Sequence, residues 1–287
     1  MDIDITHLKH SLIWQPVSMS IGSLGLSNLI CHVLYGVLDW RAVALTTSFH
    51  FISIALDHYK DHLQSYKIAK QSRNQDALNI FQFTHWMIFL SALIAVTALT
   101  QCPLSTTVKT ACFVAPALLW DFHIFEFTYK GRKEYVSVKR IPGIKPFLVG
   151  FIRGCGTYLV VESIMTPTYT YQPVYPWNPF QLIVWVMMDR SCYSFLLDIR
   201  DYDEDKRGSV RTLVVLLGSI PLSKLFLVVA HFITICIFHE NLYIIGAALY
   251  AAALGLYLDH KSHGVWFDLS CHSLTFAVAG YFIVQLT

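Results

Sequence analysis

The chain has 287 residues, of which 55% are hydrophobic and only 14% are charged, and its formal net charge is +2. A mean hydropathy of +0.49 excludes an ordinary water-soluble domain, because a soluble surface cannot accommodate so many apolar side chains. Long apolar stretches at regular intervals instead predict helices that cross a lipid bilayer, each about 20 residues long. We predict no nucleic-acid partner.

In chain order, nine apolar stretches predict membrane spans of an all-α, multi-pass bundle with a central cavity, and residues 1–287 are predicted to form one domain. The spans are expected at about 14–37, 42–62, 83–101, 108–127, 145–165, 179–199, 221–238, 241–258 and 265–286. A short amphipathic helix is expected around 209–217, before the seventh span. The seven cysteines contain no C-x-x-C pair and indicate neither a zinc site nor a disulfide framework.

Lysine and arginine residues set the predicted orientation. If the N-terminus is cytoplasmic, most of the 21 basic residues fall in segments on the cytoplasmic side, and only Arg41 and Lys109 fall in segments on the other side. Cytoplasmic loops of membrane proteins carry such an excess of positive residues. The sequence therefore predicts a cytoplasmic N-terminus and an outside C-terminus.

The second span ends in the acidic stretch SIALDHYKDH (53–62). Asp57 and Asp61 are four residues apart and therefore share one face of a helix. His58 and His62 have the same spacing but lie about 100° from the aspartates, so we predict no metal role for them.

The sixth span ends in a second acidic stretch, DIRDYDEDKRG (198–208). Asp198, Asp201 and Asp205 are spaced i, i+3, i+7, which places them on one face if the helix continues, whereas Asp203 points elsewhere. Even-numbered spans cross in the same direction, so both acidic clusters are predicted at the cytoplasmic side. Carboxylates gathered at the mouth of an apolar bundle need neutralisation, and Mg²⁺ is usually bound by carboxylates, water and substrate phosphates.

The predicted loop between spans four and five, YKGRKEYVSVKRIPGIKP (129–146), carries six basic residues and one glutamate. This excess has two interpretations, and the sequence leaves both open. It is the ordinary positive-inside signal, or it provides direct cationic contacts for a diphosphate.

Together these motifs resemble the UbiA superfamily of intramembrane prenyltransferases. The stretch DIRDYDEDKRGSVRTLVVLLG (198–218) is similar to the family's second aspartate-rich motif, D-x-x-D-x-x-x-D followed by G-x-x-x-T-L. YVSVKR (135–140) is similar to the family's Y-x-x-x-K-R element, and Asp57 and Asp61 match half of its first motif. Two features depart from the family. Ser53 and Ile54 replace the usual Asn and a frequent Asp, and no Arg-Pro follows the first motif.

The resemblance implies a Mg²⁺-dependent enzyme that ionises a prenyl diphosphate in the bilayer and transfers the prenyl group to a lipophilic aromatic or quinone-like acceptor. It implies five catalytic, metal-binding carboxylates, two in one centre and three in the other: Asp57 and Asp61, then Asp198, Asp201 and Asp205. It also implies diphosphate contacts from Tyr135, Lys139 and Arg140, with Arg73 as a further candidate.

Two other functions stay open at this stage. A UbiA-type terpene cyclase would close the allylic cation on its own alkene without an acceptor, and a divalent-ion transporter would use the carboxylates to select ions. Ionisable residues inside predicted spans tend to line cavities, so Glu162 and Asp189 are further candidates for the cavity. Tyr193 is a candidate for stabilising a cation through its ring.

Overall fold

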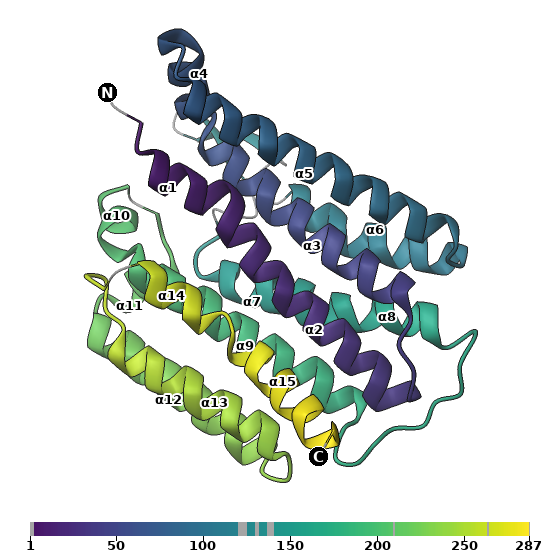
Figure 1. The fold of residues 1–287 in the computed structure, drawn as a ribbon. Coiled ribbons are helices and arrows are strands. Elements are labelled where there is room, and N and C mark those ends of the chain that lie inside the picture. Colours follow the sequence, from purple (N-terminus) through teal and green to yellow (C-terminus); the bar gives the residue numbers. More distant parts are fainter. Residues whose placement is uncertain are drawn as a thin grey trace.

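The computed structural model of the protein describes residues 3–119, 125–129, 132–136, 141–208, 210–262 and 264–286, and it is a bundle of helices with one small hairpin (Figure 1). The α-helices of the first half are α1 (Ile5–Lys9), α2 (Gln15–Tyr35), α3 (Trp40–Asp61), α4 (Leu63–Ser72), α5 (Gln75–Thr100) and α6 (Leu104–Leu119). Those of the second half are α7 (Ile144–Phe151), α8 (Thr157–Met165), α9 (Pro179–Arg200), α10 (Tyr202–Arg207), α11 (Leu213–Leu217), α12 (Ile220–Ile237), α13 (Leu242–Tyr257), α14 (Gly264–Ser270) and α15 (Ser273–Leu286). Two π-helical turns, η1 (His10–Trp14) and η3 (Ile152–Gly156), join α1 to α2 and α7 to α8. The predicted all-helical bundle is confirmed.

The helices pack as neighbours along much of their length. α3 lies against α2 and α5, α7 lies against α9, and α12 lies against α13. The C-terminal ends of α3 and α9 lie at the same end of the bundle, next to α4 and α10 (Figure 1). The two predicted acidic clusters follow these two helix ends, so the fold brings the clusters to the same end of the molecule.

Helices occupy each of the nine predicted intervals, but fewer of them pass a test of length and hydropathy. In the part of the chain that the structure describes, four helical segments are long and apolar enough to cross a bilayer: Ile5–Tyr35, Gln75–Thr100, Ile144–Met165 and Ile220–Ile237. Gly264–Ser270 and Ser273–Gln285, bent by 46°, would together make a fifth. α3 and α9 have 22 residues each and fail on polarity, because they carry the acidic motifs and other charged residues.

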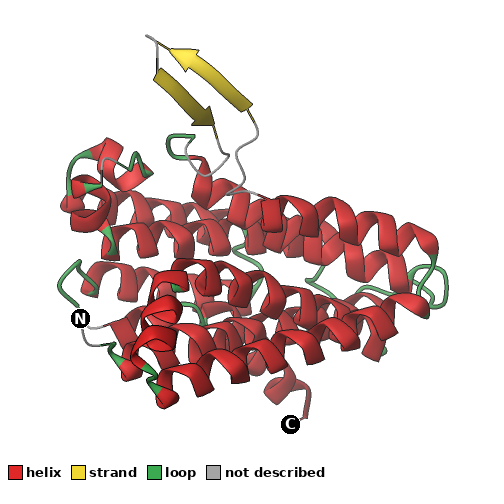
Figure 2. Cartoon of the chain, turned by 90° about the horizontal axis from the view of Figure 1, so that it is seen from above, coloured by secondary structure: helices red, strands yellow, loops and turns green. Residues whose placement is uncertain are grey.

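The predicted fourth span, 108–127, is wrong in its last part. α6 ends at Leu119, and Phe125–Tyr129 forms strand β1, which pairs antiparallel with β2 (Arg132–Val136). The sequence FEFTY alternates apolar and polar residues, which is the pattern of a strand, and it is rich in aromatic residues. Figure 2 shows the hairpin standing away from the helices, so Glu126 does not lie in a span.

The outer face of α5 is apolar. Trp86, Phe89, Leu93 and Val96 are more than half exposed, and their spacing places them on one side of the helix. A contiguous apolar face of this kind is typical of contact with lipid tails. Together with the apolar spans, it supports an integral membrane protein.

Close contact between η3 and α9 depends on a glycine. A Cβ atom added at Gly154 would lie 2.6 Å from Cγ of Met187 and 2.7 Å from its backbone nitrogen. Small residues let helices in a membrane approach each other in this way. This contact fixes η3, and with it one wall of the cavity described below.

We expect Gly154→Ala to lower the free energy of unfolding by about 1–3 kcal/mol, because the backbone of α9 cannot yield as a flexible side chain would. Gly246→Ala is the matched control, since a Cβ there meets nothing within 4 Å. Thermal unfolding of both variants in the same detergent measures the difference. Equal melting temperatures would contradict the close packing.

Candidate active site

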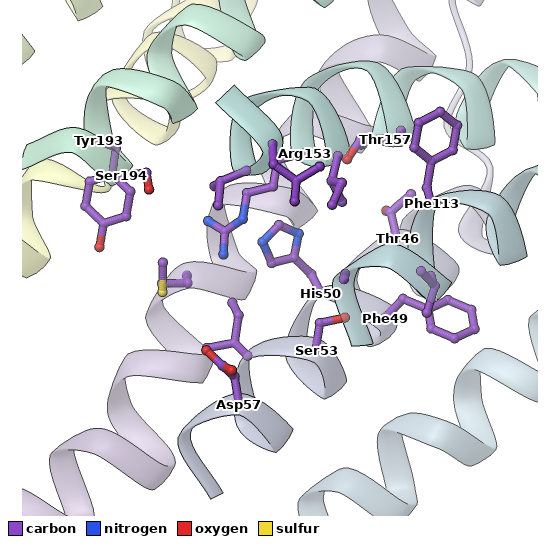
Figure 3. A pocket seen from close by; sticks show the side chains of 18 of the residues that line it. Thr46, Phe49, His50, Ser53, Asp57, Phe113, Arg153, Thr157, Tyr193 and Ser194 are labelled. Carbon is purple, nitrogen blue, oxygen red and sulfur yellow. The ribbon is translucent and has the colours of Figure 1, made fainter. Parts of the chain in front are cut away.

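A cavity of about 340 Å³ lies among α2, α3, α6, α7, η3, α8 and α9. Its polar end is formed where α3 and α9 end, by Asp57, Asp61, Lys145, Arg200 and Asp201. The remaining wall is mostly apolar or aromatic: Leu45, Phe49, Phe113, Val114, Leu148, Val149, Ile152 and Val160, among others. Figure 3 shows Asp57 on one side of this cavity and Phe113 on the other. The cavity is thus large enough for a small lipophilic molecule and has one acidic end.

Asp57 and Asp61 occupy the last two turns of α3 and both line the cavity. The predicted shared face is therefore confirmed. Ser53 and Ile54 also line it, so the two positions that depart from the UbiA pattern lie on the cavity wall itself. His58 lies on the wall as well, and its Nδ1 is 3.4 Å from Oγ of Ser11.

The three aspartates of the second motif have different environments. α9 ends at Arg200 with Asp201 as its C-cap, and a separate helix, α10, carries Asp205. The three residues therefore do not lie on one continuous helix as predicted. Asp201 lines the cavity, whereas Asp198 is completely buried beside it.

Two ion pairs hold these aspartates. Nζ of Lys145 donates to Oδ1 of Asp198 at 2.7 Å, while Oδ2 of Asp198 has no hydrogen-bond partner in the part of the chain that the structure describes. The guanidinium of Arg200 donates to both oxygens of Asp201, at 2.7 and 2.9 Å. Lys145 belongs to the basic loop 129–146, for which the sequence leaves two interpretations open, and Arg200 counts among the predicted cytoplasmic charges. Nothing in the linear pattern indicates these two ion-pair partners.

The acidic end of the cavity offers donor atoms for a metal ion. No three His, Cys, Asp or Glu side chains converge closely enough to hold one, as far as the described residues extend. The carboxylate oxygens nevertheless suit Mg²⁺, and Oδ2 of Asp198 is a buried acceptor without a partner. A completely buried carboxylate oxygen without a donor costs free energy. The burial of Asp198 therefore agrees better with a bound cation than with a helix end exposed to solvent.

Burial, and then the neighbouring charge of Asp198, raises the pKa of Asp205 to about 6. The folded protein therefore retains a proton that the unfolded chain, with a carboxyl pKa near about 4, has already released. In the metal-free protein this group favours folding at low pH, and the benefit is lost as the pH rises from about 4 through 6.

We expect Asp205→Asn to remove this part of the pH dependence. The melting temperature of the metal-free protein, measured between about pH 4.5 and pH 7 in a chelator, should fall less steeply in the variant than in the wild type. Asp203→Asn, at a side chain 62% exposed, is the control and should keep the wild-type slope. An unaltered slope in Asp205→Asn would show that another group titrates.

Farther from the aspartates, the cavity wall carries a second polar group formed by Arg153 and His50 (Figure 3). Nδ1 of His50 is hydrogen-bonded to Oγ of Ser23, and its Nε2 is buried without a partner. The Arg153 guanidinium makes no hydrogen bond or ion pair with any residue that the structure describes, whereas the buried Arg190 pairs with Asp189 at 2.6 Å. An arginine without a partner at a cavity wall is a binding group for an anion or a strong hydrogen-bond acceptor.

Arg153 lies in the predicted span 145–165, so the rule applied to Glu162 and Asp189 could have found it. Those two acids do not line the cavity. Glu162 pairs with Lys109 at 3.1 Å, and Asp189 accepts hydrogen bonds from Arg190 and Ser273. Tyr193 does line the cavity, as predicted.

The predicted diphosphate contacts are placed only in part. Arg73 ends α4 in a left-handed conformation and does not line the cavity. Tyr135 lies in β2, and Lys139 and Arg140 lie outside the described residues.

Comparison with known proteins gives a structural match and no sequence match. No protein family model and no curated protein matches the chain. A UbiA homologue from Aeropyrum pernix K1 is 11% identical, covers 100% of both chains and superposes with a TM-score of 0.58. A digeranylgeranylglyceryl phosphate synthase is 13% identical over 98% of both chains, with a TM-score of 0.49.

The match to the UbiA homologue shows that the two chains share a helical fold. The fold that the aspartate motifs predict is confirmed, over the whole length of the chain.

Proposed function

We propose that this chain is a Mg²⁺-dependent intramembrane prenyltransferase that ionises a prenyl diphosphate and transfers the prenyl group to a lipophilic acceptor. The observation that carries the proposal is that Asp57 and Asp61 of the first motif and Asp201 of the second line one end of a single, otherwise mostly apolar cavity. The proposal includes one domain over residues 1–287, with the N-terminus and both motifs on the cytoplasmic side.

In this proposal Asp57, Asp61, Asp198, Asp201 and Asp205 hold the metal. Bound Mg²⁺ would neutralise the charge that develops on the leaving diphosphate. Arg200 orients Asp201 through two hydrogen bonds. Tyr135, Lys139, Arg140 and Arg73 remain the proposed diphosphate contacts.

The apolar wall would bind the prenyl tail and exclude water, which would otherwise capture an allylic cation. The rings of Phe49, Phe113 and Tyr193 line the cavity and can stabilise positive charge. These rings also suit a terpene cyclase, which is the second candidate function.

Arg153 favours the transferase. A permanent positive charge on the wall would repel a carbocation that must migrate through the cavity during cyclisation, whereas it would attract an acceptor with an anionic or phenolic oxygen. The same charge opposes the passage of Mg²⁺ or another cation, so it also argues against a divalent-ion transporter.

The test incubates the purified full chain and Mg²⁺ with C10, C15 and C20 prenyl diphosphates, with and without a panel of aromatic and quinone-like acceptors. A transferase releases diphosphate and forms a prenylated product only when an acceptor is present. A cyclic hydrocarbon without acceptor would establish the cyclase instead, and no consumption of any diphosphate would reject both. A chelator and the Asp201→Asn variant are the negative controls.

A further inference from the structure

The ion pair between Lys145 and Asp198 involves only one of the two carboxylate oxygens of Asp198. Asp198 is 0% exposed, yet only its Oδ1 is bonded, by Lys145 at 2.7 Å, while Oδ2 has no donor. A buried carboxylate is stabilised only when its remaining lone pairs are also satisfied. Among the described residues, Oδ2 of Asp198 is therefore an unused acceptor for a second positive partner.

Lys145 separates Asp198 from the cavity. Its side chain is 31% exposed and lines the cavity wall, whereas Asp198 does not. Asp201 and Asp205 lie close enough for their charges to act on the same ammonium. The ammonium of Lys145 is thus a positive group that lies between Asp198 and the cavity.

A divalent ion and one of the two basic side chains together balance the charge of the three carboxylates, so the second basic side chain is not needed. Lys145 and Arg200 face the three carboxylates of Asp198, Asp201 and Asp205. Arg200 is fixed by two hydrogen bonds to one carboxylate, while Lys145 has a flexible stem and donates one hydrogen bond, to Asp198, among the described residues. When a divalent ion joins this cluster, the lysine is the group that can move.

We propose that Lys145 is a resident counter-ion of the second aspartate motif. It neutralises Asp198 in the metal-free protein. When a divalent ion binds the carboxylates, the ammonium of Lys145 would move away from Asp198 and bind the anionic oxygens of the diphosphate. This inference rests on the proposed function, since it concerns the same site, and it assigns Lys145 a positioning and binding role that the motif resemblance does not supply.

The inference predicts two effects of opposite sign for Lys145→Met, which removes the charge and keeps the length of the side chain. Mn²⁺ alone, followed by electron paramagnetic resonance on the full chain, should bind about fivefold or more tightly, because a competing cation is gone. Inorganic diphosphate at saturating Mn²⁺ should bind about tenfold or more weakly, because a charged hydrogen bond is lost.

Lys261→Met, at an exposed lysine, is the matched control and should alter neither affinity. Lys145→Gln, which can still donate a hydrogen bond to Asp198, repeats the test if the methionine variant does not fold. Unchanged or weaker Mn²⁺ binding in the Lys145 variants would overturn the inference, as would unchanged diphosphate binding. If the wild-type chain binds no Mn²⁺ in a manner sensitive to Asp201→Asn, the proposed function fails as well; if it does, the inference alone is at stake.

Discussion

Asp201→Asn should lower Mg²⁺-dependent turnover of a prenyl diphosphate by about 100-fold or more. Metal stabilisation of a leaving group is worth several kcal/mol, and each 1.36 kcal/mol corresponds to about tenfold in rate. The substitution keeps the shape of the side chain and removes its charge. It also leaves the guanidinium of Arg200, which now donates to both Asp201 oxygens, without its carboxylate.

Asp203→Asn is the matched control for this experiment. Asp203 is two residues away, its side chain is 62% exposed, and its Oδ2 lies 3.7 Å from Nε2 of His260. An exposed carboxylate of this kind contributes little to a neighbouring site, so we expect turnover within about twofold of the wild type. Release of diphosphate, measured at equal amounts of folded protein, gives the comparison. Equal losses in the two variants would mean that the cavity assignment of Asp201 is wrong.

Arg153→Met should reduce the kcat/KM for the acceptor by about 10- to 100-fold, because a hydrogen bond from a charged group to a buried acceptor is worth about 1.5–3 kcal/mol. Binding of the prenyl diphosphate should change much less, since Lys145, at the polar end of the cavity, precedes Arg153 by about two helical turns along α7 and η3. The expected signature is therefore a loss confined to the acceptor, measured by varying each substrate separately.

Arg211→Met, at an exposed arginine of the same charge, should leave both substrates unaffected. Arg153→Lys should recover part of the loss, because it restores the charge without the planar guanidinium. If Arg153→Met instead weakens both substrates equally, Arg153 supports the diphosphate end, and the case against a cyclase is removed.

Much of this site could be predicted from the sequence because it depends on local spacing. The separation of Asp57 and Asp61 by one helical turn fixes a shared face, and both acids line the cavity. The even numbering of two spans predicts that the clusters meet at one end, and Asp201 lines the same cavity. These results follow from helix geometry and from the direction of the chain.

The environment of each charged side chain depends on contacts between helices, which the spacing of residues in the sequence does not predict. Asp198 and Asp201 are three residues apart, yet one is buried against Lys145 and the other faces the cavity, because α7 approaches α9 closely and α9 ends at Arg200. Arg153 was missed for a different reason: an isolated charge in a predicted span is informative only when its possible partners are known.

The count of spans illustrates a physical limit of hydropathy. The helices that build the site, α3 and α9, are too polar to pass a test of apolarity, because they carry the acidic motifs and other charged residues. The aromatic FEFTY segment, in contrast, looks apolar but forms a strand.

The position of Arg153 has a consequence for how the polypeptide enters the membrane. The segment Ile144–Met165 is among the apolar spans, yet it carries this arginine near its middle. A basic residue at that position raises the apparent free energy of insertion through the translocon by about 2.5–3.5 kcal/mol. The charge has no carboxylate partner among the described residues, so no preformed ion pair lowers that cost. Integration of this segment is therefore expected to depend on its neighbours, above all α9, so that the group proposed to select the acceptor also makes the fifth and sixth helical stretches cooperate during biosynthesis.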